Sequence, residues 1–135
     1  MNLEISTDPN RLDVGLIHHF LSEDSYWAQG RALEVTRRAI ANSLCFGAYR
    51  DGRQVGFARV VTDRATFAWL ADVFVVEEER GLGVGKALLA AVLAHPELQE
   101  VRRMLLATRD AHTLYAQFGF RPLDSPDRFM ARQAP

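Results

Sequence analysis

Residues 73–93 read VFVVEEERGLGVGKALLAAVL and combine an apolar strand pattern, a glycine-rich loop and an amphipathic helix pattern. The loop leads directly into the helix, so the backbone N–H groups at the helix start have no acceptor within the helix. These amides and the helix dipole favour an anion, phosphate above all. Glycine lets such a ligand approach the backbone, because no Cβ stands in the way. The stretch therefore predicts a phosphate-binding site.

Two common phosphate-binding patterns fit this loop poorly. A P-loop has the form G-x-x-x-x-G-K-(S/T), but Arg80 stands at its first glycine and Ala87 at its hydroxyl position. No hydroxyl is therefore placed to hold Mg²⁺. The dinucleotide pattern G-x-G-x-x-G would begin at Gly81, but Lys86 stands in place of its third glycine. That pattern also belongs to a parallel sheet, whereas the sheet predicted below is mainly antiparallel.

A third pattern, (Q/R)-x-x-G-x-(G/A), is matched in full by RGLGVG at Arg80–Gly85. A second segment, AHTLYAQFGF at residues 111–120, fits A-x-x-(L/F)-Y-x-x-x-G-F. On these motifs and on the order of its elements, nearly the whole chain resembles the GNAT superfamily of N-acetyltransferases. That family binds the pyrophosphate of coenzyme A with the first motif. Members of the family often carry Asn three residues before the second motif, where it contacts the pantetheine arm. This chain has Thr108 at that position, and its hydroxyl can make some of the same hydrogen bonds.

Hydrophobic periodicity and turn residues predict a single α+β domain over residues 1–135. Asp8-Pro9 is typical of a helix start, and Asp51-Gly52 is a tight-turn signal between two strands. The middle strands follow one another closely, so we expect a mixed, mainly antiparallel central sheet flanked by helices. Strands are predicted at 3–5, 44–50, 54–62, 67–76, 101–108, 120–123 and 128–132, and helices at 8–21, 31–43, 85–96 and 110–118.

The composition disfavours several classes of function. With a net charge of −1, the chain has no long-range attraction for nucleic acid or an anionic membrane. It shows neither a signal-peptide pattern nor an apolar run of the roughly 20 residues that span a bilayer, so we expect a cytoplasmic protein. The single cysteine, Cys45, fits a reducing compartment and is interpreted as a buried apolar residue. The scattered histidines predict no metal site.

The resemblance implies a GNAT-like fold with coenzyme A bound at the strand-loop-helix of residues 73–93, and acetyl-CoA as co-substrate. The backbone amide near Val75 would polarise the thioester carbonyl, where two neighbouring strands splay apart. The loop amides would hold the pyrophosphate, with Lys86 adding a point charge. The residues expected to bind coenzyme A are Val73, Phe74, Val75, Arg80, Gly81, Leu82, Gly83, Val84, Gly85, Lys86, Thr108 and Tyr115.

Two residues are candidates for catalysis. Tyr115 stands where the family's acid tyrosine falls and would protonate the departing thiolate; the alternative is a half-buried aromatic residue on a helix. Asp72 is a carboxylate within an apolar strand, which suggests a base that deprotonates the amine directly or through water. Its alternatives are a hydrogen bond to a neighbouring strand or exposure to solvent. Many relatives use ordered water and have no single essential base.

The acceptor is expected between the first helices, their loop and the middle strands. Aromatic faces and carboxylates in residues 23–27 would attract an ammonium group. Tyr26 and Trp27 are therefore candidate substrate-binding residues, with Phe67 and Trp69 as an apolar wall. The alternative is a solvated loop anchored by one tryptophan. Elsewhere, the acidic run at residues 77–79 is interpreted as a solvated turn.

The expected function is acetyl transfer from acetyl-CoA to a primary amine. Three alternatives stay open: a non-catalytic acetyl-CoA sensor or regulator, an acyltransferase for another acyl-CoA, and a nucleotide-phosphate binder unrelated to coenzyme A. A sensor has no need of the Tyr115 hydroxyl, and the failed P-loop and dinucleotide patterns disfavour the third alternative. The acceptor is open among small amines and proteins. Members of the family are often dimers, so the resemblance is also compatible with a homodimer.

Overall fold

An antiparallel meander of four strands forms most of the sheet. In the computed structural model, which describes residues 2–134, the strand order is β1-β2-β3-β4-β5. The first three pairs are antiparallel, and β4 pairs with β5 in parallel. The predicted α+β class with a mixed, mainly antiparallel sheet is confirmed. The strands are β1 Leu3–Ser6, β2 Leu44–Arg50, β3 Arg53–Thr62, β4 Phe67–Val75 and β5 Arg103–Leu105.

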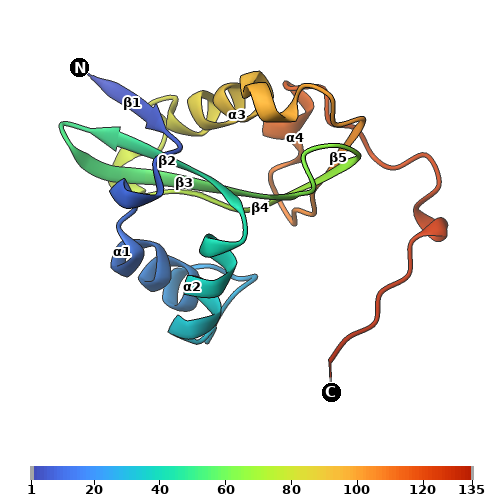
Figure 1. Cartoon of the computed structure of the whole chain (residues 1–135), viewed down its shortest axis with the longest axis horizontal. Coiled ribbons are helices and arrows are strands. Elements are labelled where there is room, and N and C mark those ends of the chain that lie inside the picture. The colour runs from blue at the N-terminus through green and yellow to red at the C-terminus, as the bar shows by residue number, and fades with distance from the viewer. Residues whose placement is uncertain (1, 135) are drawn as a thin grey trace.

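Helices cover both faces of the sheet. In Figure 1, α1 and α2 lie below the sheet and α3 lies above it, with α4 next to the end of the sheet that carries β5. Asp13 caps α1 by accepting the Leu16 N–H at 3.0 Å. The first helix therefore begins later than predicted, and Pro9–Arg11 forms a separate 3-10 turn. The helices are α1 Val14–His19, α2 Leu33–Ala41, α3 Val84–Ala94 and α4 His112–Ala116.

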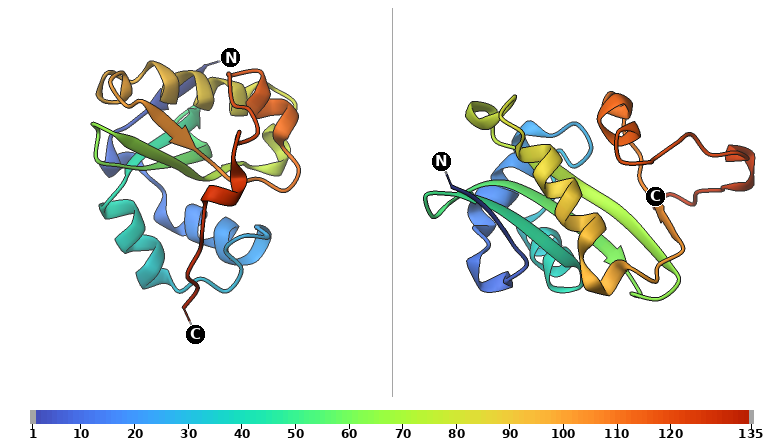
Figure 2. Two further views of the ribbon diagram at one scale, coloured as in Figure 1. Left: turned by 90° about the vertical axis from the view of Figure 1, so that its right-hand side faces the viewer. Right: turned by 90° about the horizontal axis from the view of Figure 1, so that it is seen from above.

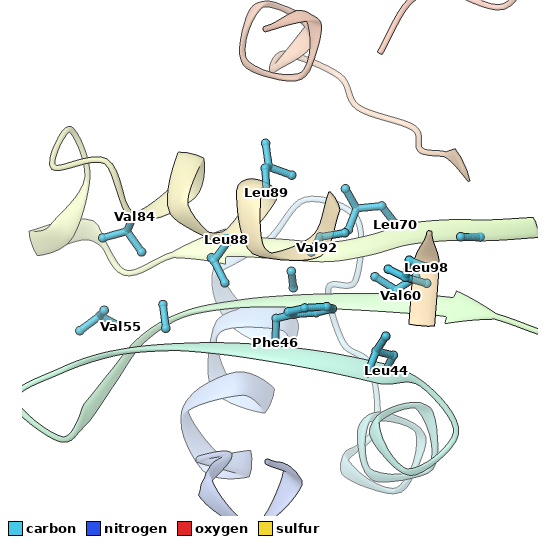
Figure 3. Packing of buried hydrophobic residues seen from close by; sticks show 13 residues of the cluster. Leu44, Phe46, Val55, Val60, Leu70, Val84, Leu88, Leu89, Val92 and Leu98 are labelled. Carbon is cyan, nitrogen blue, oxygen red and sulfur yellow. The ribbon is translucent and has the colours of Figure 1, made fainter. Parts of the chain in front are cut away.

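Two apolar cores hold the layers together. The larger core fills the space between the sheet and α3 (Figure 3). The smaller one, on the opposite face, joins Ile17 of α1 to Phe57 and Phe74 of the sheet. Because α3 buries one continuous face at helical spacing, its N-terminus is held in a fixed place above the strands. The buried residues of α3 are Val84, Leu88, Leu89 and Val92.

A bulge in β4 reverses which residues face each side of the sheet. The register between β3 and β4 shifts there, so β4 holds one residue more than β3. Asp72 lies in this stretch with a φ of 53°, an uncommon conformation for a residue other than glycine. Leu70, before the bulge, packs in the core under α3, and so does Val73 after it. Phe74 joins the opposite core.

Two expectations from composition can be checked in the described residues. Cys45 is buried in β2, and burial raises the pKa of its thiol to about 11. The thiol is therefore neutral near pH 7, and the interpretation as a buried apolar residue is confirmed. None of the described helices is both long enough and apolar enough to cross a bilayer.

The C-terminal segment differs from the prediction. Residues 120–123 and 128–132 form no strand, and a 3-10 turn at Pro126–Arg128 lies between them. β5 is shorter than the predicted strand 101–108, and α4 is shorter than the predicted helix 110–118. The tail runs away from the body of the protein (Figures 1 and 2). Its strand-forming residues therefore meet no neighbouring strand in this chain, and an unpaired strand is not stable alone.

Gly56 lies where β3 passes beneath the start of α3. A Cβ at this position would come within 3.1 Å of Leu88 Cδ1 and Val84 Cγ1, and within 3.2 Å of the Phe74 carbonyl oxygen. We therefore expect Gly56→Ala to lower the free energy of unfolding by about 1–3 kcal/mol through overpacking. Urea denaturation followed by circular dichroism measures the change.

Gly15→Ala is the matched control, because a Cβ at Gly15 would meet only an Asp13 carboxylate oxygen at 3.5 Å. Alanine suits a helix interior better than glycine, so this variant should be as stable as the wild type or more stable. If both variants unfold at the same urea concentration, α3 does not pack on β3 as closely as described.

Candidate active site

The parallel pair β4–β5 opens into a gap. The two strands pair over only three positions, of which the last joins Trp69 to Leu105. β5 ends at Leu105, whereas β4 continues to Val75. Within the described residues, no strand pairs with the outer edge of β4 beyond Trp69. Backbone N–H and C=O groups on that edge are therefore free to bind a ligand.

The free edge of β4 presents an amide donor at Val75. The Val76 N–H donates to the Val55 carbonyl oxygen of β3 at 2.9 Å. Successive N–H groups of a strand point to opposite edges, so the Val75 N–H points into the gap. The Val75 carbonyl oxygen lies on the same edge and accepts a hydrogen bond from Arg80 Nε at 3.2 Å. The gap thus places a free amide donor beside a guanidinium.

The glycine-rich loop ends in an uncapped helix N-terminus. Gly81 and Gly83 have φ angles of 78° and 86°, and a Cβ at either would meet no atom within 4 Å. These glycines are thus required by backbone conformation rather than by lack of space. In α3 the first intrahelical bond runs from the Ala87 N–H to the Gly83 carbonyl oxygen at 3.0 Å. No side chain caps the preceding amides, so they are available to an anion.

A cavity of about 360 Å³ lies at this helix N-terminus. Its volume falls within the range of small-molecule sites, about 300–1,000 Å³. The Val75 side of the gap forms one wall of the cavity and α4 forms another, so the anion site and the gap are continuous. The amides and the two basic side chains fit a pyrophosphate group. The lining residues are Val75, Glu79, Arg80, Gly81, Gly83, Val84, Gly85, Lys86 and Leu114.

Sequence reasoning missed an ion pair at the edge of this cavity. Of the acidic run, Glu77 and Glu78 are exposed as expected, but Glu79 is buried. Its carboxylate accepts a hydrogen bond from Arg50 Nε at 2.8 Å. The guanidinium offsets a negative charge that would otherwise repel phosphate. The only sequence signal was that Glu79 directly precedes the glycine-rich motif.

Tyr115 projects from α4 and is half-buried. Burial raises the pKa of its phenol, and the neighbouring Tyr26 raises it further. The ring packs edge-on against Phe120, with the ring centroids 5.9 Å apart. Thr108 lies on the connection that leads to this helix, and its Oγ1 accepts the Ala111 N–H at 3.1 Å. The Thr108 hydroxyl can still donate its own proton to a ligand.

The loop after α1 reaches across the gap toward α4. Tyr26 and Trp27 are 42% and 40% exposed, and their rings meet edge-to-face at 5.1 Å. The Tyr26 hydroxyl accepts the Arg109 backbone N–H at 2.8 Å, and the Arg109 guanidinium lies 3.9 Å from the Tyr26 ring centroid. Because Tyr26 also affects the pKa of Tyr115, the predicted acceptor and acid residues are brought together.

Asp72 is the anchor of this loop. Its carboxylate, 2% exposed, accepts hydrogen bonds from Trp27 Nε1 at 2.8 Å, Arg31 at 2.9 Å and Arg59 at 2.8 Å. Burial pushes the pKa of Asp72 up, but the charge of Arg59 and the hydrogen bonds from Arg31 and Trp27 outweigh it. The pKa of Asp72 is therefore lower than usual. Both oxygens are occupied by donors, which disfavours the predicted role as a base.

The structure does not bring all of the predicted acceptor residues together. At about 3.3 Å per residue, Phe67 lies about 25 Å from Val75 along β4. Trp69 lies only two residues closer to Val75 than Phe67 does. The side chains of Phe67 and Trp69 are both partly exposed. Neither makes a ring contact with Tyr26 or Trp27 among the described residues. Phe67 is therefore too far from the Val75 amide to touch a small amine bound beside it.

Comparisons with known proteins agree on one family. The family model described as "Acetyltransferase (GNAT) domain" matches residues 41–122. A Gibberella zeae protein assigned as an acetyltransferase is 32% identical over 87% of this chain and 78% of its own length. The spermine/spermidine N(1)-acetyltransferase of Bacillus subtilis is 27% identical over 89% of this chain and 87% of its own.

A solved structure shows the same fold over the full length. A Xanthomonas campestris protein assigned to the GNAT family is 55% identical, with a TM-score of 0.96 over 100% of this chain and 95% of its own. The fold and these relatives thus define an acyltransferase of the acetyltransferase class. The chain belongs to the GNAT family of acetyltransferases. Within the described residues no cluster of His, Cys, Asp and Glu could hold a metal ion.

The Asp72 network predicts a pH-dependent contribution to stability. Asp72→Asn removes the negative charge between two guanidiniums and should lower the free energy of unfolding at pH 7 by about 1–3 kcal/mol. Because its pKa is lowered in the fold, the carboxylate stabilises the protein above its unfolded pKa of about 3.9. That contribution is lost as the pH falls through the folded pKa. The difference between wild type and variant should therefore shrink below about pH 3.9, as measured by urea denaturation.

Asp24→Asn provides the control, since Asp24 is an exposed carboxylate near the same loop. It should unfold as the wild type does at every pH. An Asp72→Asn variant as stable as the wild type at pH 7 would show that the network does not stabilise the loop.

Proposed function

We propose that this protein transfers an acetyl group from acetyl-CoA to a primary amine by direct attack on the thioester. The observation that carries the proposal is the gap between β4 and β5. It leaves the Val75 amide free beside the cavity at the N-terminus of α3, and α4, which carries Tyr115, borders that cavity through Leu114. A thioester held there would meet a hydrogen-bond donor on one side and a proton donor on the other.

Acetyl-CoA supplies the activated acyl group, and this chain's residues orient it. The uncapped amides of α3, with Arg80 and Lys86, suit the pyrophosphate, and the gap suits the extended pantetheine arm. The Val75 N–H would donate to the carbonyl oxygen as negative charge builds on it. The amine nitrogen forms the new C–N bond, and the C–S bond breaks. The amine loses one proton, and the departing thiolate takes up one.

Tyr115 would supply the proton that the thiolate takes up. Its raised pKa keeps the phenol protonated at neutral pH, which is the state that a general acid requires. Among the described residues, its one aromatic ring partner is Phe120, and its hydroxyl has no described acceptor. A non-catalytic acetyl-CoA sensor would have no use for a phenol in this place.

We assign Asp72 a positioning role in place of the base predicted from the sequence. Its carboxylate already accepts three hydrogen bonds and has a lowered pKa, so it is a weak proton acceptor near pH 7. Its bond to Trp27 fixes the loop that also carries Tyr26. Because the Asp72 carboxylate is not free to accept a proton, water in the gap would take the proton of the amine instead.

The charges around this loop bear on the acceptor. Beside Trp27, the guanidiniums of Arg31 and Arg59 outnumber the single carboxylate of Asp72, and Arg109 stacks on Tyr26. The buried part of this side of the gap therefore has no surplus negative charge to hold a polycation, and the carboxylates of Glu23, Asp24 and Asp110 lie in exposed segments nearby. A monoamine, with an aromatic or carboxylate group near the nitrogen, fits these surroundings better than the polyamines named for the Bacillus subtilis relative.

The direct test measures thiol release from acetyl-CoA with a panel of amines. The panel includes arylalkylamines, amino acids, spermidine, aminoglycosides and short peptides, and propionyl-CoA serves as a second donor. We expect turnover of a monoamine with acetyl-CoA and weak turnover of spermidine. No thiol release with any amine, together with tight acetyl-CoA binding by calorimetry, would support the sensor instead. No binding of either acyl-CoA would refute coenzyme recognition itself.

Tyr115→Phe removes one oxygen atom and leaves the ring packing on Phe120. If the phenol protonates the thiolate, kcat should fall at least about tenfold. The dissociation constant for acetyl-CoA should stay within about twofold, because the pyrophosphate is bound elsewhere. Steady-state kinetics and calorimetry on one preparation measure both quantities.

Tyr49→Phe is the matched control, since the Tyr49 hydroxyl is buried in β2 without a hydrogen-bond partner. This variant should keep full activity. An unchanged kcat in Tyr115→Phe would remove the acid role, and an equal loss in both variants would point to a general effect on the fold.

A further inference from the structure

Two guanidiniums share a single carboxylate oxygen beside the loop after α1. Arg31 Nη1 and Arg59 Nε both donate to Oδ2 of Asp72, at 2.9 and 2.8 Å. The side chains of Arg31 and Arg59 are only 20% and 14% exposed, and among the described residues neither pairs with another acid. One positive charge is therefore left over in a partly buried place, where it attracts an anion more strongly than it would at an exposed surface.

The guanidinium of Arg31 keeps one edge free. A guanidinium carries five N–H donors, and within the described residues only Nη1 of Arg31 has an acceptor. Nε and Nη2 lie side by side on the remaining edge of the plane, and two parallel N–H groups of this kind bind both oxygens of a carboxylate at once. Arg59 offers less, because its Nη1 also donates to Ser43 Oγ at 3.1 Å.

This cluster of Arg31, Arg59 and Asp72 lies on the acceptor side of the site. The Asp72 carboxylate also binds Trp27 Nε1 at 2.8 Å, and Trp27 belongs to the loop expected to meet the acceptor. Along β4, Val75 follows Asp72 by three residues, which is at most about 10 Å of extended chain. The cluster is therefore about the length of one small molecule away from the amide that would polarise the thioester.

An apolar strip of the sheet borders the cluster. Arg59 and Val61 alternate along β3 and so share one face of the sheet, and Val61 pairs with Trp69 of β4. Both of these large apolar side chains are exposed, so the helices below the sheet do not cover this part of the face. A ligand whose charged group meets Arg31 can rest its carbon chain on this strip.

Arg109 is the other cation beside the loop, and it is less suited to hold an anion. Its guanidinium is exposed and pairs with the Asp110 carboxylate at 3.3 Å. It also stacks on the Tyr26 ring. Its charge is thus balanced and screened by solvent, whereas that of the buried cluster is not.

We propose that Arg31 binds a carboxylate of the acceptor, so that the amine acetylated by this protein belongs to an amino acid. This role of Arg31 rests on the proposed acetyl transfer, and it favours a carboxylate over an aromatic group as the feature that identifies the acceptor. The carboxylate would occupy the Nε–Nη2 edge and neutralise the surplus charge of the cluster. The amine nitrogen would face the gap, and the products would be an N-acetyl amino acid and coenzyme A as the free thiol.

The first test compares amines that differ only in the carboxylate. The pairs are phenylalanine with phenethylamine, β-alanine with ethylamine, and δ-aminovalerate with butylamine, each assayed for thiol release from acetyl-CoA. In the wild type, kcat/KM should be at least about tenfold higher for the acid of at least one pair, mainly through KM. Arg31→Gln should bring this ratio close to one. Damage to the packing around Asp72 alone would lower both members of a pair equally and keep the ratio.

Arg64→Gln is the matched control, since Arg64 forms an ion pair with Glu97 in the turn between β3 and β4. It should keep the ratio of the wild type. Arg109→Gln should keep that ratio as well. A wild type without any preference for the acids, an unchanged ratio in Arg31→Gln, or a ratio lost in Arg109→Gln instead would each overturn the proposal.

Calorimetry separates a failure of this role from a failure of the proposed function. Protein with coenzyme A in excess is titrated with the same amino acids and amines. An amino acid that binds at least about tenfold more tightly than its paired amine, and loses this advantage in Arg31→Gln, would support the carboxylate site even without thiol release. Equal binding within every pair would overturn the role of Arg31, and thiol release in the assay would then still support acetyl transfer.

Discussion

The hydrogen bonds of the Asp72 carboxylate hold the two halves of the site in one arrangement. Asp72 lies in the bulge of β4, where the backbone takes a left-handed conformation and the strand exchanges its two faces. Without that exchange, Phe74 would point toward α3 rather than into the core between the sheet and α1. The carboxylate then reaches the loop after α1 and binds Trp27 and Arg31. A local distortion with a cost of about 1–3 kcal/mol is thus offset by three charge-assisted or polar contacts.

The two edges of β4 differ in their pairing: one edge pairs with β3, and the other pairs only in part with β5. Toward β3 it is paired on both sides of the bulge, as far as Val76, which keeps the strand rigid. Toward β5 it is paired only as far as Trp69, so the amide of Val75 is both fixed in position and free of a partner. A donor with these two properties loses little entropy on meeting a developing negative charge, which is what electrostatic stabilisation requires. The early end of β5 is therefore as important to the site as any side chain.

The structural features that the sequence predicted correctly are those that depend on a local pattern of residues. The strand-loop-helix of residues 73–93 and the antiparallel meander were readable because glycine spacing and apolar periodicity are local signals. The bulge at Asp72 was not readable, because a carboxylate in an apolar strand does not reveal which distant groups will meet it. Glu79 shows the same limit, since its partner Arg50 lies on another strand. The predicted strands at 120–123 and 128–132 have suitable residues but no neighbouring strand within residues 2–134.

Tyr115 is surrounded by three loop segments, whose sequence can change without changing the strands and helices of the fold. The anion-binding amides of α3 belong to a short continuous segment, and they are kept by backbone conformation alone. The surroundings of the phenol come instead from the loop that carries Tyr26, from the connection after β5 and from the segment around Phe120. If the proposed function holds, changes in these segments would alter the acceptor without disturbing the amides at the start of α3. On the proposed function, this separation lets the segments around Tyr115 vary while the fold and the strand-loop-helix of residues 73–93 stay unchanged.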